Sequence, residues 1–226
     1  MKLYHGTSKQ ALEGILKEGI LPRKEGVGNW EKYPSSPKMV YLTVAYPFYF
    51  GLVHASKSEE IVVLEIDSDL LATSKLYPDE DYLSQVRSDI GNHHKYMKDI
   101  EKHKMEWSDS LEHLGNVSYK GIVSVEAITR YCIFRHRDRV SLTTMFLDPT
   151  ICIMNYKFVG TKYKQMVEWM FGDREGLPMN EDFLRMEDLG GSVKKFLSIE
   201  RKWKEAESKN RSGIVIVNVK KDLNHA

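Results

Sequence analysis

The sequence is poor in cysteine and has no excess of either charge. Its two cysteines, Cys132 and Cys152, are too few for a disulfide framework and lack metal-site spacing, so we expect core thiols in a reducing compartment. Thirty-three Lys and Arg residues stand against 32 Asp and Glu residues, a formal net charge of +1. This balance excludes a global attraction to nucleic acid or membranes and leaves only local patches.

Long apolar runs and several common motifs are also missing. No run approaches the about 18 residues of a membrane span, and the first residues lack a signal-peptide apolar region, so we expect a cytoplasmic protein without membrane segments. The glycine motifs of phosphate loops, Rossmann folds and α/β-hydrolases are absent. A group of histidines and glutamates lacks zinc-site spacing, so we expect no metal there: His93, His94, His103, Glu101 and Glu106.

Short strands and helices dominate what is present. With 226 residues, 42% of them hydrophobic, we expect one compact domain. The pattern predicts a strand at Leu3–His5 that ends in a turn at Gly6–Ser8, and a helix at Lys9–Glu18 capped by Ser8 and Gly19. Further strands are predicted at 39–43, 61–66, 116–123, 128–134, 151–159 and 214–217, and a loop at 22–38. Helices are predicted at 79–114, through 163–170, and through His54 and Ala55 after the aromatic stretch 46–50. This order is typical of an α+β fold.

Two predicted strand ends carry polar groups in the same arrangement, His5-Gly6-Thr7 and Tyr41-Leu42-Thr43. A glycine lets a flat ligand approach its backbone closely, and a histidine can donate a hydrogen bond to a sugar hydroxyl. The pattern favours a nucleotide-like ligand. On these residues alone, the alternative of a half-buried histidine and a packed core tyrosine stays open.

These two blocks, together with Leu12, Ile15-Leu16 and Gly19-Ile20, resemble the first motifs of the His-Tyr-Glu class of ADP-ribosyltransferases. The class includes the poly(ADP-ribose) polymerases and the DarT-type toxins. Segments 110–116 and 148–151 are also similar to a group of bacterial and phage proteins. The resemblance implies an α+β fold with a split, mostly antiparallel β core and helical insertions. We expect the core at 1–140, an insertion at about 75–115, and an extension at 141–226 packed on the core.

The resemblance also implies roles for individual residues, with NAD as co-substrate. His5 would hold the ribose next to the adenine, the Gly6 backbone would pair with the nicotinamide carboxamide, and the Tyr41 ring would stack on the nicotinamide. Tyr49 or Phe50 would supply a second aromatic wall. The predicted NAD-binding set is His5, Gly6, Thr7, Tyr41, Thr43, Tyr49 and Phe50.

The third catalytic position departs from the family pattern. Members carry a glutamate or aspartate at the start of a late strand, where this sequence has Asn116. Glu112 precedes it by one helical turn and ranks second, Glu126 ranks third, and the cluster Asp79-Glu80-Asp81 is another source of charge. For each carboxylate a solvated surface charge is the alternative. The predicted catalytic set is His5, Tyr41, Asn116 and Glu112.

Basic and aromatic residues favour a nucleic-acid acceptor over a protein acceptor. Arginines alternate in the segment 135–139, and further candidates for phosphate contacts or base stacking are Lys120, Arg130, Trp30, Tyr33 and Trp107, with solvated or core residues as the alternative. The resemblance implies an NAD-dependent mono-ADP-ribosyltransferase that acts as a toxin or phage-defence effector with an antitoxin partner. The alternatives are an RNA 2'-phosphotransferase, a family with a second histidine where Tyr41 stands, and a catalytically silent binding or immunity module, favoured by the uncharged Asn116.

Overall fold

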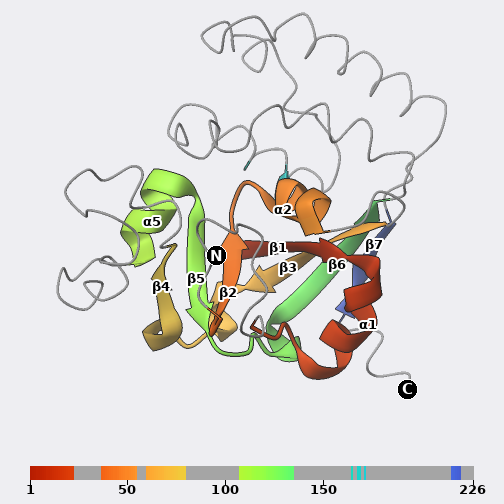
Figure 1. The fold of residues 1–226 in the computed structure, drawn as a ribbon, viewed down its shortest axis with the longest axis horizontal. Helices are drawn as coiled ribbons and strands as arrows, with labels where there is room; N and C mark the ends of the chain where they lie inside the picture. The colour runs from red at the N-terminus through yellow and green to blue at the C-terminus, as the bar shows by residue number, and fades with distance from the viewer. Residues whose placement is uncertain are drawn as a thin grey trace, which may run out of the picture.

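A computed structural model of the protein describes residues 1–22, 37–54, 60–79, 107–134, 164, 167–168, 171 and 215–219 (Figure 1). Its helices are α1 (Lys9–Glu18), α2 (Pro47–His54) and α5 (Trp107–Leu114), with short 3-10 turns η1 (Ser68–Leu70), η2 (Thr73–Lys75) and η3 (Val125–Ala127). The strands are β1 (Lys2–Ser8), β2 (Met39–Thr43), β3 (Ile61–Asp67), β4 (Leu76–Pro78), β5 (Asn116–Lys120), β6 (Ile128–Phe134) and β7 (Val215–Asn218). All strand pairs are antiparallel, so the predicted α+β, mostly antiparallel fold is confirmed.

The seven strands form one sheet in the order β4-β5-β2-β1-β3-β6-β7. β3 is central, pairing along its whole length with β1 and also with β6. Residues 61–66 of β3 are all buried, which explains the nearly continuous apolar run that predicted this strand. Viewed as in Figure 1, α2 lies above β1 and α1 lies below it.

The sheet is split between β1 and β2. These two strands pair only at Tyr4 and Thr43, whereas β2 pairs with β5 along its whole length. In Figure 1, β2 and β5 run steeply through the view while β1 crosses it. The sheet therefore consists of two parts, β4-β5-β2 and β1-β3-β6-β7, joined at one position, as the resemblance implied.

The predicted turn at Gly6–Ser8 is wrong, because β1 continues to Ser8. Its last three residues stay in register with Val63, Val62 and Ile61 of β3, and this apolar ladder holds them extended. Ser8 occupies the N-cap position of α1, but its side chain makes no capping hydrogen bond. Gly19 ends the helix with φ at 83°, and its N–H donates to the Ile15 carbonyl.

The strand predicted at 116–123 is too long, and its neighbourhood differs from the prediction. β5 ends at Lys120, because Gly121 takes φ 97°, although its N–H still donates to the Lys38 carbonyl in the register of the β2–β5 pair. Val123 pairs with Ile20 instead. Although β5 and β6 follow each other in the chain, three strands separate them in the sheet. β4 lies in a segment that was not predicted to be a strand, and it extends the sheet beyond β5.

Residues from the C-terminal third contribute to the same sheet and core. β7 pairs with β6 as the edge strand, and Val167 and Phe171 are buried in the main hydrophobic cluster. Cys132 is also fully buried, while Cys152 and the segments 23–36, 80–106 and 135–163 lie outside the described residues. The proposed boundary at residue 140 stays a prediction. Among the described residues, no helix is long and apolar enough to span a membrane.

Candidate functional site

His5 lies at the split of the sheet, one residue after the last β1–β2 pair. Its Nδ1 atom is 3.0 Å from the backbone carbonyl oxygen of Tyr41 on β2. A carbonyl can only accept a hydrogen bond, so Nδ1 carries the proton and donates. The neutral imidazole therefore has its lone pair on Nε2, which makes Nε2 an acceptor for a hydroxyl group.

The backbone of Gly6 faces the same split. The Lys9 N–H donates to the Glu60 carbonyl at 2.9 Å, and the Ser68 N–H donates to the Met1 carbonyl at 3.0 Å, which fixes the hydrogen-bonded pairs of β1 with β3 at odd β1 positions. The N–H and C=O of Gly6 then point away from β3, toward β2. Within the described strands, no β2 residue is paired with Gly6. A donor and an acceptor of one residue therefore lie side by side at the split.

The other side of Gly6 packs against the first turn of α2. A Cβ atom at Gly6 would lie 1.7 Å from the Pro47 carbonyl oxygen and 2.6 Å from the Gly51 nitrogen, so only glycine fits. Two aromatic residues of this turn, Tyr49 and Phe50, are half-buried, with ring centroids 5.4 Å apart. The helix that packs against Gly6 thus carries two partly exposed rings. Their role as an aromatic wall stays a prediction.

The register brings Tyr41 and Asn116 onto one face of the sheet. Tyr41 pairs with Ser118 and Thr43 pairs with Asn116, and side chains directly opposite each other share a face. Thr43 also pairs with Tyr4, so the face that carries Tyr4 and Gly6 on β1 is the same one. The predicted tyrosine and the predicted third residue therefore share a face on β2 and β5, whereas His5, between Tyr4 and Gly6, belongs to the opposite face and reaches β2 through the Tyr41 carbonyl at the split.

Asn116 is buried without hydrogen bonds. Asn116 is only 1% exposed, and neither its Nδ2 nor its Oδ1 atom has a hydrogen-bond partner in the described structure. An unsatisfied buried polar group destabilises a fold by about 1–3 kcal/mol, so native proteins usually pair such a group with protein, water, an ion or a ligand. The amide is suited to a ligand that both donates and accepts hydrogen bonds.

Thr43, directly opposite Asn116, is fully bonded instead. Its hydroxyl donates to the Gly115 carbonyl at 3.0 Å and accepts from the N–H groups of Ala45 and Tyr46 at 3.1 and 3.0 Å. These bonds fix the turn between β2 and α2. The structure therefore gives Thr43 a backbone-holding role next to the site, and Thr7 lies half-buried on β1 with its backbone paired to β3.

The carboxylates named in the sequence differ strongly in burial. Glu112 on α5 and Glu126 in η3 are exposed, and a hydrogen bond from the Ser124 hydroxyl lowers the pKa of Glu126. Asp79, directly after β4, is only 2% exposed, and its N–H donates to the Ser110 hydroxyl at 2.9 Å. Glu80 and Asp81 lie outside the described residues. Asp79 is thus the buried member of the named carboxylates that the structure describes.

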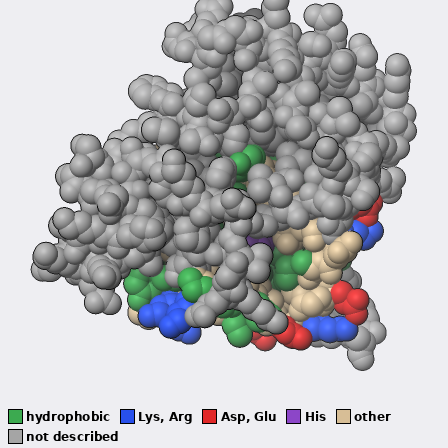
Figure 2. All heavy atoms as spheres, viewed as in Figure 1, with side chains coloured by type: hydrophobic (Ala, Val, Ile, Leu, Met, Phe, Trp, Pro, Cys, Tyr) green, Lys and Arg blue, Asp and Glu red, His purple; other side chains and the backbone are tan. Residues whose placement is uncertain are grey.

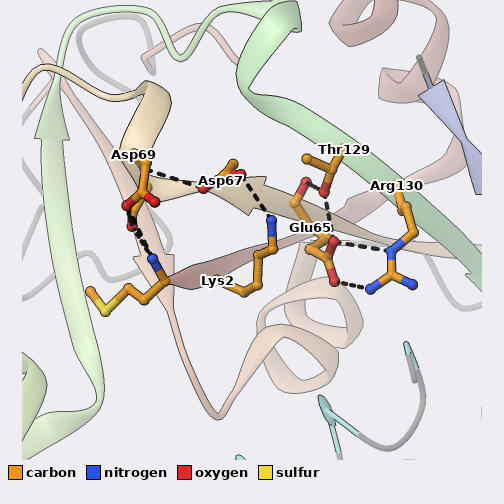
Figure 3. A network of polar contacts seen from close by, with 8 residues as sticks. Lys2, Glu65, Asp67, Asp69, Thr129 and Arg130 are labelled. Carbon is orange, nitrogen blue, oxygen red and sulfur yellow. Dashed lines mark hydrogen bonds and ion pairs between the residues drawn. The ribbon is translucent and has the colours of Figure 1, made fainter. Parts of the chain in front are cut away.

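A buried ion pair occupies the β3–β6 side of the same sheet face (Figure 3). Arg130 donates from Nε and Nη2 to the two carboxylate oxygens of Glu65 at 3.0 and 2.5 Å, and from Nη1 to the Phe171 carbonyl at 2.5 Å. The Thr129 hydroxyl donates to Glu65 at 2.6 Å. Burial first, and then the Glu65 charge, raise the pKa of Tyr4. Sequence reasoning missed Glu65, although a lone glutamate inside an apolar strand was its signal.

Several of the residues expected to contact nucleic acid lie outside the described residues: Trp30, Tyr33, Arg135, Arg137 and Arg139. Arg130 is committed to Glu65, and the Lys120 ammonium lies 5.8 Å from the centre of the Tyr77 ring. Trp107 is half-buried against the core. On the described surface that Figure 2 shows, basic and acidic side chains are interspersed, which matches the ion pairs Lys2–Asp67, Lys9–Glu60 and Lys17–Glu13.

Comparisons with known proteins give one short sequence match. No family model matches the chain. It is 38% identical over 71 residues to a probable RNA 2'-phosphotransferase of Pyrococcus furiosus, a stretch that covers 30% of this chain and 31% of that protein. Among solved structures, EcPltA aligns with a TM-score of 0.35 and 10% identity over 58% of this chain and 74% of its own. The chain is therefore distantly similar to an RNA 2'-phosphotransferase over less than a third of either length.

Proposed function

We propose that this protein is an NAD-dependent mono-ADP-ribosyltransferase whose site lies at the split between β1 and β2. The observation that carries the proposal is the buried, unbonded amide of Asn116 on the sheet face of Tyr41. A dinucleotide with ribose hydroxyls and a carboxamide has the donors and acceptors that such a site lacks. The resemblance of the His5 and Tyr41 blocks to the His-Tyr-Glu class supports the same ligand.

Each residue has a specific task in this proposal. The N–H and C=O of Gly6 pair with the carboxamide of nicotinamide, which needs one acceptor and one donor. The Tyr41 ring stacks on the nicotinamide, and Tyr49 or Phe50 closes the opposite side. His5 accepts a ribose hydroxyl at Nε2, because its Nδ1 proton is held by the Tyr41 carbonyl. Asn116 binds the hydroxyl of the second ribose.

The reaction is a glycosyl transfer. The bond between the nicotinamide nitrogen and C1' of the ribose breaks, and its electron pair leaves with nicotinamide. An acceptor oxygen or nitrogen forms the new bond to C1' and releases its proton to solvent. Positive charge develops on the ribose in the transition state, so groups fixed around the ribose before reaction lower the barrier.

We propose nucleic acid ahead of protein as the acceptor, and a role as toxin or defence effector that an antitoxin would restrain. Purified protein incubated with NAD labelled in the adenylate part tests both steps. Nicotinamide release reports bond cleavage, and label on RNA, DNA or protein, with a mass increase of one ADP-ribose, reports the acceptor. A protein that neither releases nicotinamide nor transfers label is not this enzyme.

A second candidate, an RNA 2'-phosphotransferase, is favoured by the 71-residue similarity. Tyr41 argues against it, because the resemblance places a histidine there in that family. RNA with a single internal 2'-phosphate, incubated with NAD, separates the two functions. Loss of the 2'-phosphate supports the second candidate, whereas ADP-ribose attached to RNA with the phosphate retained supports the first. Calorimetric binding of an NAD analogue without turnover would support a silent binding module.

A further inference from the structure

The proposed site carries no negative charge of its own. Asn116 is neutral where the resembled class has a carboxylate, and Glu112 and Glu126 are solvent-exposed. A positive charge that develops on the ribose gains most from a carboxylate held in a water-excluded site, because the attraction is weakly screened there. A buried carboxylate next to Asn116 would supply this charge.

Asp79 is placed there by the β4–β5 register. Tyr77 pairs with Ser118 and Pro78 pairs with Val117, the last pair of the ladder, and the same register continued by one residue would set Asp79 opposite Asn116. Directly opposite residues have Cβ atoms about 4.5–5.5 Å apart and share a sheet face. The face in question is the one that carries Tyr41.

Two serines hold the end of β4 in position. The Ser118 hydroxyl donates to the Pro78 carbonyl at 2.9 Å, and the Ser110 hydroxyl on α5 accepts the Asp79 N–H at 2.9 Å. Both serines are fully buried, and Asp79 itself is 2% exposed. Aspartate is almost never buried to this extent unless it is paired, so Asp79 is held in place by its contacts. The neighbouring Asn116 amide, buried and unbonded, points to a ligand at the same place.

We propose that Asp79 supplies the negative charge that Asn116 lacks, and that the two residues share the task of the single carboxylate in the resembled class. Asn116 binds the ribose hydroxyl, and the Asp79 carboxylate stabilises the positive charge on the ribose in the transition state. This inference rests on the proposed function. Asp79 directly follows β4, a strand well separated in sequence from β5.

Asp79→Asn tests the charge, with nicotinamide release measured over a range of NAD concentrations. We expect kcat to fall about 100-fold or more, the range for losing one stabilising group at a developing charge, while KM changes less than about threefold. Asp69→Asn, which makes the same change at an exposed carboxylate outside the proposed site, is the matched control and should keep wild-type kcat. An Asp79→Asn variant with near wild-type kcat overturns the inference.

Moving the negative charge to position 116 distinguishes an electrostatic role of Asp79 from a purely structural one. Asn116→Glu in the Asp79→Asn background should restore at least about tenfold of the lost kcat, because one carboxylate again faces the ribose. Loss of activity without any rescue, together with a lower melting temperature of Asp79→Asn, indicates a structural role and overturns the inference.

A third variant needs no change at Asp79 and covers the case in which Asp79→Asn does not fold. Asn116→Asp puts a second carboxylate beside the first, and two adjacent carboxylates raise the pKa of one of them. The acidic limb of the kcat–pH profile should therefore move to higher pH than in wild type. An unmoved limb overturns the placement of Asp79. A wild-type protein that releases no nicotinamide overturns the proposed function itself, whereas an active wild type unaffected by these variants overturns only this inference.

Discussion

The His5 imidazole donates from Nδ1 to the Tyr41 backbone carbonyl over 3.0 Å, at the point where β1 and β2 stop pairing. In a regular sheet the Tyr41 carbonyl would accept a hydrogen bond from a backbone N–H of β1. Here the His5 side chain donates to it instead. The same contact fixes which imidazole nitrogen carries the proton. The split of the sheet and the chemistry of its histidine are therefore set by one interaction.

Two amide variants separate the structural bond of His5 from its proposed ligand bond. In His5→Asn the side-chain N–H₂ replaces Nδ1 and nothing replaces Nε2, so we expect near wild-type stability but a loss of NAD-dependent activity. His5→Gln offers the reverse arrangement and should lose about 0.5–1.5 kcal/mol, the net value of one hydrogen bond. Chemical denaturation and nicotinamide release measure the two effects. Full activity in His5→Asn would contradict the assigned role of Nε2.

The contact between Gly6 and α2 predicts a strong difference between two glycines. Gly6→Ala would place a methyl group 1.7 Å from the Pro47 carbonyl oxygen, so α2 has to move and both stability and activity should fall. We expect a loss of about 2 kcal/mol or more, the upper range for a steric clash in a packed core. Gly14→Ala in α1 meets nothing within 4 Å and should stabilise the protein by about 0.5–1 kcal/mol. Equal effects of the two changes on the unfolding midpoint would refute this packing.

Local patterns in the sequence predict most of the helices and strands, but not which strands pair with each other. The helical spacing of Leu12 and Ile15 predicted α1, and the apolar run 61–66 predicted the central strand. The predicted end of β1 is wrong because glycine is common in turns. Gly6 stays in the strand because α2 packs so closely against it that no side chain fits, and this contact comes from another part of the chain. β4 has only three residues, too few to show the alternation of apolar and polar side chains that identifies a strand. It forms because it pairs with the edge of β5.

The candidate site shows the same limit. His5, Gly6 and Tyr41 were predicted from two short blocks, since each block lies on one strand. The burial of Asp79 beside Asn116 depends on the pairing of strands about 40 residues apart, which no local pattern contains. Thr43 had the right position for a ligand contact, but the Gly115 carbonyl and two N–H groups use its hydroxyl.

The unbonded amide of Asn116 predicts opposite effects on stability and activity. Asn116→Leu keeps the branched shape of the side chain without its polar atoms, so we expect the free energy of unfolding to rise by about 1–3 kcal/mol. Activity should be lost, because the leucine cannot bind a hydroxyl. Thr43→Val on the opposite position removes three hydrogen bonds and should destabilise the protein, which makes it the matched control. A destabilised Asn116→Leu would show that the amide is bonded in solution.

The pair Lys2–Asp67 predicts a pH effect at the start of β1. The hydrogen bond from Lys2 Nζ, 3.0 Å long, lowers the pKa of the Asp67 carboxyl. A lowered carboxyl pKa stabilises the fold above the pKa of the unfolded state and loses this effect as the pH falls through the folded pKa. Lys2→Met should therefore cost less than about 1 kcal/mol at neutral pH, as for exposed ion pairs, and this cost should disappear as the pH falls through the lowered pKa of Asp67. Urea unfolding of both proteins between pH 2.5 and 7 measures this difference, and a constant difference would contradict it.

The Glu65–Arg130 pair predicts strong non-additivity, because Glu65 is 2% exposed and Arg130 also bonds the Phe171 carbonyl. Arg130→Met leaves the carboxylate buried without its cation and should destabilise the protein by about 3–5 kcal/mol. Glu65→Gln in the same background removes the uncompensated charge and should recover a large part of that loss. Denaturant unfolding of the two single variants and the double variant gives the coupling energy between the residues. Additive effects on the free energy of unfolding would show that the charges of Glu65 and Arg130 do not stabilise each other. A double variant less stable than Arg130→Met would contradict the burial of Glu65.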